Sequence, residues 1–122
     1  MQDWNVLLVD DEEEFVTTLA ERLRLRGIPV RVTTDGEEAL RMMEKEPPQV
    51  VVLDVLMPGL SGLEVLKRIQ ADNPGVKVIL LTGQGSTWDG IQGMRMGVFD
   101  YLMKPLNIDE LIDKIREAIG EN

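Results

Sequence analysis

The fold is decided by the stretch Val50-Val51-Val52-Leu53-Asp54, in which four apolar residues end at a carboxylate. Two further stretches are similarly apolar and rich in valine: Val6–Val9 and Val76–Leu81, the second interrupted by Lys77. Strands that are buried on both faces of a parallel sheet have this composition, whereas strands with one solvent face alternate apolar and polar residues. The three stretches therefore predict the central strands of a parallel sheet with helices on both faces.

Two other stretches have the character of edge strands. Residues 28–32 alternate and carry Pro29, and residues 98–102 contain the charge of Asp100. Between the five stretches, apolar residues recur at helical spacing: Phe15, Leu19 and Leu23; Leu63, Leu66 and Ile69; Leu111, Ile115 and Ile119. We therefore predict an α/β fold, a flavodoxin-like doubly wound (βα)5 sandwich with a five-stranded parallel sheet of order 2-1-3-4-5. We expect a single domain over residues 1–122.

The expected helix starts carry capping signals. In each, a residue that caps helices precedes an acidic residue by three positions, the capping-box arrangement or a variant of it. The pairs are Asp11 and Glu14, Asp35 and Glu38, Ser61 and Glu64, Asn107 and Glu110, and, more loosely, Ser86 and Asp89. They predict five helices, one after each strand.

Composition excludes several classes of function. The chain of 122 residues has no cysteine and no histidine, so disulfides, thiolate or imidazole metal sites and histidine acid–base catalysis are ruled out. A net charge of −9 argues against direct binding of nucleic acid, which needs a basic face. The apolar runs are too short to cross a bilayer, and residues 1–9 contain no secretion signal. We expect a cytoplasmic protein with no membrane partner.

The residues that follow each strand indicate the chemistry, because the functional crevice of an open α/β sheet lies beyond the carboxyl ends of its strands. Asp10 and Asp11 follow the first strand, Asp54 ends the third, Thr82 follows the fourth and Lys104 the fifth. Taken singly, each signal is weak: an isolated aspartate near a helix start is more often a cap. In the order 2-1-3-4-5, however, all five residues meet at one end of one sheet.

Crowded carboxylates repel one another unless a cation lies among them, and oxygen ligands of this kind suit Mg²⁺. A metal, an ammonium, a hydroxyl and a spare carboxylate together suit the stabilisation of a transferring phosphoryl group. Asp54 is the predicted nucleophile, forming an aspartyl phosphate. The residue before Pro105 is held in an extended or turn geometry, and the sequence leaves open a cis bond there.

The chain resembles the receiver domain of two-component response regulators from about residue 5 to residue 119. The matching motifs are Val9-Asp10-Asp11-Glu12, Leu53-Asp54-Val55-Leu56-Met57-Pro58-Gly59 with Gly62, Leu81-Thr82-Gly83, and Phe99-Asp100-Tyr101-Leu102-Met103-Lys104-Pro105. No core motif position departs from the family pattern.

The resemblance implies a role for each motif residue. Asp54 is the phosphoacceptor, and Mg²⁺ is bound by Asp10, Asp11, Asp54 and the backbone carbonyl of Leu56. Thr82 and Lys104 contact the phosphoryl group. Tyr101 is the aromatic residue whose rotamer follows Thr82 and passes the state to the face formed by the fourth helix, fifth strand and fifth helix.

The resemblance also implies the partners. The donor is the phosphohistidine of a sensor histidine kinase or of a histidine phosphotransfer protein, and small acyl phosphates often substitute for it. The output goes to a downstream effector protein or to a fused output domain, and a phosphorylation-dependent homodimer stays open. Such a domain catalyses only its own phosphorylation and dephosphorylation, so we do not expect an enzyme with an external substrate.

Two further expectations concern residues outside the core motif positions. Leu56, two residues after Asp54, cannot orient a water molecule by hydrogen bonding, which predicts slow self-dephosphorylation; Gln84 is the corresponding neighbour of Thr82. Gly90 and Gly93 fall within the fourth helix, and each costs about 0.8–1 kcal/mol relative to alanine. Either the fourth helix is the least stable one, or these glycines allow close packing against the sheet.

Methionines near the expected output face leave a similar choice. Met94, Met96 and Met103 form either an adaptable partner surface or, for at least one of them, part of the core.

Three other classes of protein compete with this interpretation. A flavin-binding protein of the same architecture needs a phosphate-cradling loop after the first strand, where this chain has a run of five acidic residues, 10–14. A phosphatase of the haloacid dehalogenase type needs an aspartate at position 56, which is leucine. A degenerate receiver that acts as a phosphorylation-independent interaction module is the third, and the intact Asp54, Thr82 and Lys104 argue against it.

Overall fold

The computed structural model describes residues 3–54, 62–83 and 87–120. Five strands alternate with five helices in these ranges. The strands are β1 (Val6–Val9), β2 (Val30–Thr33), β3 (Val50–Asp54), β4 (Lys77–Thr82) and β5 (Asp100–Met103). The helices are α1 (Glu13–Leu25), α2 (Gly36–Lys45), α3 (Gly62–Asp72), α4 (Thr87–Arg95) and α5 (Ile108–Ile119).

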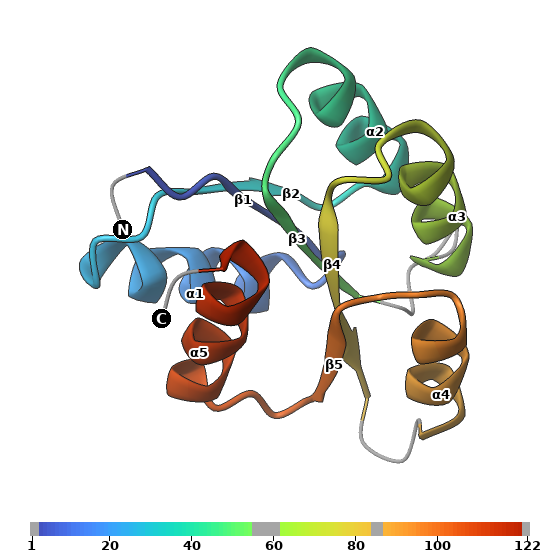
Figure 1. Ribbon diagram of the computed structural model, residues 1–122. Coiled ribbons are helices and arrows are strands. Elements are labelled where there is room, and N and C mark those ends of the chain that lie inside the picture. Colours follow the sequence, from blue (N-terminus) through green and yellow to red (C-terminus); the bar gives the residue numbers. More distant parts are fainter. Residues whose placement is uncertain (1–2, 55–61, 84–86, 121–122) are drawn as a thin grey trace.

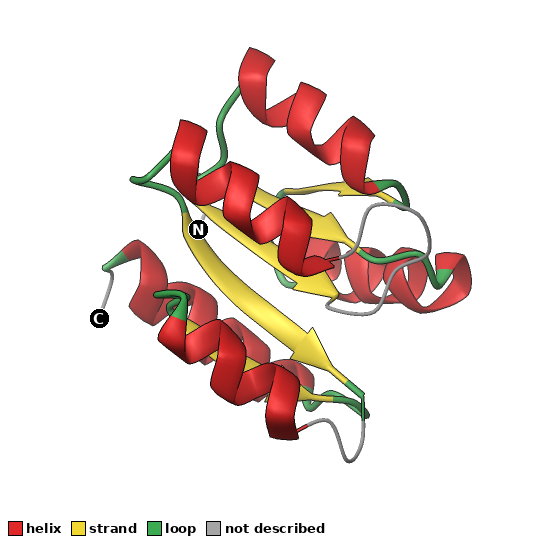
Figure 2. Cartoon of the chain, turned by 90° about the vertical axis from the view of Figure 1, so that its right-hand side faces the viewer, coloured by secondary structure: helices red, strands yellow, loops and turns green. Residues whose placement is uncertain are grey.

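All strand pairs are parallel, and the sheet has the order β2-β1-β3-β4-β5. Helices α1 and α5 cover one face of the sheet, and α2, α3 and α4 cover the other (Figure 1). The view turned by 90° shows the same three layers, with the twisted sheet between helices (Figure 2). The predicted fold class and strand order are therefore confirmed.

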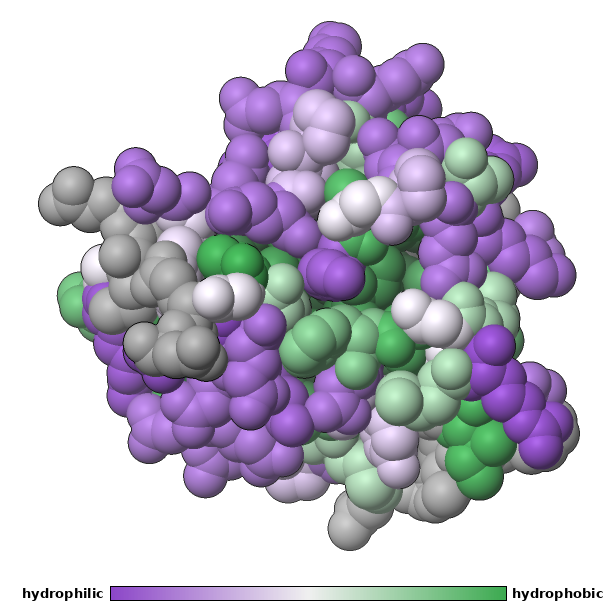
Figure 3. Space-filling model, in the orientation of Figure 1, coloured by the Kyte–Doolittle hydropathy of each residue, from purple (hydrophilic) through white to green (hydrophobic). Residues whose placement is uncertain are grey.

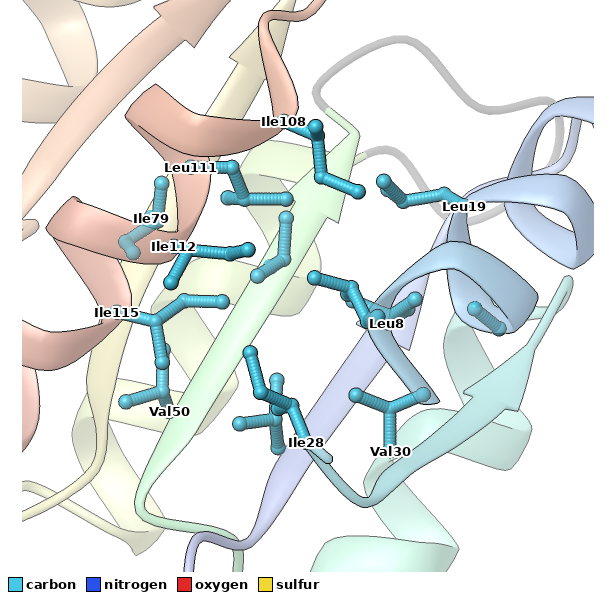
Figure 4. Packing of buried hydrophobic residues seen from close by; sticks show 14 of the residues in the cluster. Leu8, Leu19, Ile28, Val30, Val50, Ile79, Ile108, Leu111, Ile112 and Ile115 are labelled. Carbon is cyan, nitrogen blue, oxygen red and sulfur yellow. The ribbon is translucent and has the colours of Figure 1, made fainter. Parts of the chain in front are cut away.

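Alternate residues of the central strands pack into two separate cores. Leu8, Val50 and Ile79 face α1 and α5, where Figure 4 shows them among Leu111, Ile115 and other buried side chains. Their chain neighbours face α2, α3 and α4: Leu7, Val9, Val51, Leu53, Val78 and Leu80. Both faces of β3 and most of β4 are thus buried, which explains why these strands are continuously apolar.

The capping predictions have mixed outcomes. The side chains of Asp35 and Asn107 accept the amides of Glu38 and Glu110, both at 3.1 Å, as predicted. The prediction that Asp11 caps the first helix is wrong: α1 begins at Glu13 with Glu12 as its N-cap residue, and no side-chain cap bond is made. Ser61 and Ser86 lie outside the described residues.

The edge strands begin later than predicted, at residue 30 instead of 28 and at residue 100 instead of 98. The physical reason is the same at both places, because each preceding helix ends in a Schellman motif that uses these residues. After α1, Ile28 donates its amide to Leu23 O at 3.1 Å, with Gly27 at a φ of 79°. After α4, Val98 donates to Gly93 O at 3.2 Å, with Gly97 at a φ of 89°.

Gly93 is explained by packing. A Cβ at this position would clash with the Cδ1 of Leu80, a fully buried side chain of β4, and would lie 3.5 Å from Cγ2 of Val98. The close-packing alternative therefore holds for Gly93, while the packing of Gly90 falls outside what the structure describes. That the fourth helix is the least stable one stays a prediction, which amide exchange across the helices would test.

We expect Gly93→Ala to lower the free energy of unfolding by about 1–3 kcal/mol, because overpacking against Leu80 outweighs the better helix propensity of alanine. Urea unfolding measures the change. Gly75→Ala is the matched control, since a Cβ at Gly75 would have nothing within 4 Å, and its effect should stay within about 0.5 kcal/mol. A Gly93→Ala protein as stable as the parent would show that α4 does not need this close approach.

Candidate functional site

The register of the sheet brings the predicted site residues to one end of it. Val9 pairs with Leu53, so Asp10 and Asp54 leave neighbouring strands at the same level. Asp54 in turn pairs with Leu81, the residue before Thr82. Thr82 pairs with Met103, and its carbonyl oxygen accepts the amide of Lys104 at 2.8 Å. Backbone pairing alone therefore gathers residues that are far apart in the sequence.

Both principal carboxylates are buried. Asp10 is 1% exposed and Asp54 is 5% exposed. Asp10 Oδ1 accepts the amide of Glu12 at 2.9 Å, a bond that orients the Asp10 carboxylate at the end of β1. Buried acids are rare unless they are paired with a cation or coordinate a metal, so the burial itself indicates a functional site.

Lys104 supplies a positive charge to this pair. Its Nζ lies 2.9 Å from Asp10 Oδ2 and 3.9 Å from Asp54 Oδ2, and it also contacts Glu12 Oε1. The ammonium lies 4.3 Å from the centre of the Phe15 ring, a cation–π distance. The peptide bond between Lys104 and Pro105 is cis, the geometry that the sequence left open.

The directions of the pKa shifts of Asp10 and Lys104 follow from this arrangement. Burial raises the pKa of Asp10, and the opposing hydrogen bonds from Lys104 and from the Glu12 amide do not cancel that effect. Burial lowers the pKa of Lys104, but its hydrogen bonds to Glu12 and Asp10 outweigh the burial and raise the pKa above its usual value. The site thus has an excess of negative charge and favours added positive charge.

Thr82 is a buried hydroxyl next to the carboxylates. The residue is 0% exposed, and its Oγ1 has no hydrogen-bond partner among the described residues. A buried polar atom without a partner is uncommon and calls for an explanation such as a ligand or a catalytic role. A group bound on Asp54 would supply an acceptor for this hydroxyl.

The structure gathers a carboxylate that the sequence did not single out. Oxygen atoms of Asp10, Glu12 and Asp54 lie within 4.8 Å of one another, a grouping able to hold a metal ion. Asp11, a predicted ligand, is partly buried and does not belong to this group. Glu12 has an extended backbone, and residues two apart in extended chain point to the same side. That geometry was the available signal for Glu12, which the sequence presented only as part of an acidic helix start.

Two further predictions concern Leu56 and Tyr101. Leu56 lies outside the described residues, so its carbonyl remains an expectation. Tyr101 lies on β5, is half-buried and packs against the core on the α2–α4 side of the sheet. Its register partner is Leu80 of β4, two residues before Thr82.

The face formed by α4 and β5 carries exposed apolar side chains. Ile91, Met94 and Met103 are 42%, 46% and 42% exposed, whereas Met96 packs against the core. The prediction that at least one of these methionines is core is confirmed. Figure 3 shows a largely hydrophilic surface, with apolar residues gathered in the middle of the view and near α4. In the described part of the chain, no helix has the length and apolarity needed to cross a membrane.

Comparison with known proteins identifies the class that this fold and this site define. Residues 6–116 match the response regulator receiver domain, and the chain belongs to that family.

Curated relatives are similar over almost the whole chain. The chain is 38% identical over 122 residues to the uncharacterized transcriptional regulatory protein YkoG of Bacillus subtilis, covering all of this chain and 54% of YkoG. It is 37% identical over 114 residues to the alkaline phosphatase synthesis transcriptional regulatory protein PhoP of the same organism, covering 93% of this chain and 48% of PhoP. The chain therefore spans about half the length of these relatives.

Solved structures agree with the fold. A putative response regulator from Chloroflexus aurantiacus superposes with a TM-score of 0.90 at 32% identity, over 97% of this chain and 98% of the other. The receiver domain of NtrX from Brucella abortus also gives a TM-score of 0.90, at 29% identity, over 96% of this chain and 99% of the other. The described part of this receiver domain thus has its family's architecture.

Proposed function

We propose that this receiver domain is a phosphoacceptor switch of a two-component phosphorelay, in which Asp54 takes a phosphoryl group from a phosphohistidine. The main support for the proposal is the position of Lys104, whose Nζ lies 2.9 Å from Asp10 and 3.9 Å from Asp54. The buried hydroxyl of Thr82, at the end of the neighbouring strand β4, has no hydrogen-bond partner among the described residues. A nucleophilic carboxylate, a cation and a hydroxyl donor are the groups that in-line phosphoryl transfer uses.

The proposed step is a displacement at phosphorus. A carboxylate oxygen of Asp54 bonds to the phosphorus as the bond between phosphorus and the donor imidazole nitrogen breaks. The bonding electrons return to that nitrogen, which takes up one proton from solvent to give neutral imidazole. Lys104 and Thr82 then pair with the phosphoryl oxygens, which carry the transferred negative charge.

The residues present fit a divalent cation. The carboxylate oxygens of the buried Asp10 and Asp54 and the exposed Glu12 converge within 4.8 Å, and the pKa of Asp10 is raised; hard cations such as Mg²⁺ prefer oxygen donors of this kind. Asp10 and Asp54 would hold the ion, with Asp11 and the Leu56 carbonyl as the further ligands that the family resemblance implies. When bound, Mg²⁺ supplies positive charge that offsets the charge on the phosphoryl oxygens.

Phosphorylation would change the output surface through Thr82 and Tyr101. When the Thr82 hydroxyl moves toward the phosphoryl group, it frees space near Tyr101. A change in the rotamer of Tyr101 then alters the surface of α4, β5 and α5. The exposed Ile91, Met94 and Met103 give that surface an apolar character suited to a protein partner.

The partners follow from this function. A sensor histidine kinase or a histidine phosphotransfer protein would supply the phosphoryl group, in the cytoplasm. The receiver of the output would be an effector protein or a fused domain, and the transcriptional relatives favour control of transcription. The net charge of −9 favours an indirect role for this domain at nucleic acid. We also propose that residues 1–122 form a single domain and that this domain catalyses only its own phosphorylation and dephosphorylation. A phosphorylation-dependent homodimer is part of the same proposal.

Intact mass after incubation with Mg²⁺ and acetyl phosphate tests the function. We expect one added phosphoryl group, which disappears when Mg²⁺ is chelated and in Asp54→Asn. No addition in the presence of saturating Mg²⁺, together with none from phosphohistidine donors, would contradict the proposal and favour the phosphorylation-independent interaction module.

The lifetime of the phosphorylated form tests the role of position 56. Because leucine has no group that can orient an attacking water molecule, we expect Leu56→Asn to lose its phosphoryl group faster than the parent, by roughly tenfold for one productive hydrogen bond. The measurement is the decay of the phosphorylated mass after removal of donor. Leu56→Met is the control that changes shape without adding a hydrogen bond. Equal decay in all three proteins would refute this explanation.

A further inference from the structure

Lys104 has a partner that the proposed chemistry does not use. Its ammonium contacts Glu12 and lies 2.9 Å from Asp10, whereas Asp54 lies farther away at 3.9 Å. The Lys104 side chain is only 16% exposed, while that of Glu12 is 60% exposed. The Lys104 ammonium therefore lies closer to Asp10 and Glu12 than to Asp54, the residue that is to carry the phosphoryl group.

The start of α1 builds this position from two residues. Glu12 is the N-cap residue of α1, and its backbone is tied to Asp10 Oδ1 by a 2.9 Å hydrogen bond. Phe15, in the first turn of the helix, places its ring 4.3 Å from the ammonium. The carboxylate of Glu12 and the ring of Phe15 thus both hold the same ammonium, from a segment separated by about 90 residues from Lys104.

We propose that Glu12 is a positioning residue that holds Lys104 in a resting position and thereby slows the phosphorylation of Asp54. This inference rests on the proposed phosphoacceptor function. Asp10 belongs to the proposed cation site, so its attraction for Lys104 weakens when its charge is shared with a cation. Glu12 is not one of the residues proposed to hold the ion, so its contact with Lys104 must break before Lys104 reaches a phosphoryl group on Asp54.

The size of the effect follows from the exposure of Glu12. Ion pairs with an exposed partner are weak, so their loss changes a barrier modestly. We expect Glu12→Gln to be phosphorylated by acetyl phosphate about three- to tenfold faster than the parent at saturating Mg²⁺. Glu13→Gln removes the same charge from the neighbouring residue, for which no contact with Lys104 is found in the described part of the chain, and it should leave the rate unchanged within about twofold.

A second readout uses the protein without metal or donor. The ¹⁵N signal of the Lys104 ammonium, assigned by its loss in Lys104→Arg, should shift in Glu12→Gln and stay in place in Glu13→Gln. Calorimetric titration of the parent, Glu12→Gln and Glu13→Gln with Mg²⁺ distinguishes a positioning role from metal binding. If Glu12 served mainly as a metal ligand, the Glu12→Gln protein would bind Mg²⁺ more weakly and would be phosphorylated more slowly.

The outcomes are distinct. A faster Glu12→Gln with a shifted ammonium signal supports the proposal. An unchanged or slower Glu12→Gln, an equal acceleration in Glu13→Gln, or an unmoved ammonium signal overturns it while the parent is still phosphorylated. A parent that takes up no phosphoryl group from any donor instead refutes the proposed function, and the inference with it.

Discussion

Lys104→Met is expected to lose about 2–3 kcal/mol of unfolding free energy in the absence of divalent cations. Removing one partner of a fully buried ion pair costs about 3–5 kcal/mol, and the partial exposure of Lys104 reduces that figure. The loss arises because Asp10 and Asp54 would remain buried without the ammonium between them. Since the Lys104 pKa is raised in the folded state, the stabilisation is present below its ordinary pKa and disappears as the pH rises through the raised value.

Chemical denaturation at neutral pH, with and without Mg²⁺, measures this effect. Mg²⁺ should restore part of the stability of Lys104→Met, because a cation at the carboxylates replaces the missing charge. Lys67→Met is the control: Lys67 is 63% exposed and pairs with Glu64 at 3.6 Å on the surface of α3, so its change should stay within about 0.5 kcal/mol. A Lys104→Met protein as stable as the parent would mean that the carboxylates do not depend on Lys104.

Asp10→Asn is expected to change stability in the opposite direction from Lys104→Met. It should raise the unfolding free energy of the metal-free protein by about 1–2 kcal/mol at pH 7. The variant should also lose phosphoryl uptake. The raised pKa of Asp10 means that the folded state binds its proton more tightly than the unfolded state does. The folded protein therefore loses stability as the pH rises from about 4 through the raised pKa, and the penalty persists at neutral pH. Asparagine keeps the shape of the side chain without the charge.

The pH dependence distinguishes this explanation from a general effect of charge. The gain in Asp10→Asn should shrink as the pH falls through the raised pKa of Asp10, where Asp10 of the parent takes up its proton in the folded state. Asp113→Asn is the matched control, because Asp113 is 69% exposed and pairs with Arg116 on the surface of α5. An Asp10→Asn protein less stable than the parent at neutral pH would show that the Lys104 ion pair outweighs the burial of Asp10.

Most of the fold could be predicted from the sequence because buried parallel strands have few alternatives. The valine-rich runs ending at Val9 and Asp54 are apolar on both faces, and only a sheet covered by helices on both sides buries them. The starts of β2 and β5 were less predictable. Apolar residues such as Ile28 and Val98 satisfy a strand pattern and a Schellman contact equally well, and three-dimensional packing decides between them.

The residues of the candidate site were likewise only partly predictable from the sequence. Asp10, Asp54, Thr82 and Lys104 were found because each ends or directly follows a strand, and strand order fixes where such residues meet. Glu12 was missed because its role depends on the direction of a side chain and on the reach of a lysine 92 residues away. The two-residue spacing from Asp10 indicates the side to which Glu12 points, but it does not reveal that Lys104 reaches that carboxylate.

Asp54 is the residue proposed to carry the phosphoryl group, and chemical reduction tests this directly. Borohydride reduces an aspartyl phosphate to homoserine, so the phosphorylated protein can be reduced, digested and sequenced by mass spectrometry. We expect homoserine at position 54, dependent on Mg²⁺ and donor, with aspartate unchanged at positions 10 and 11. Homoserine at Asp10 or Asp11, or a phosphoryl group stable to borohydride on a hydroxyl side chain, would contradict it.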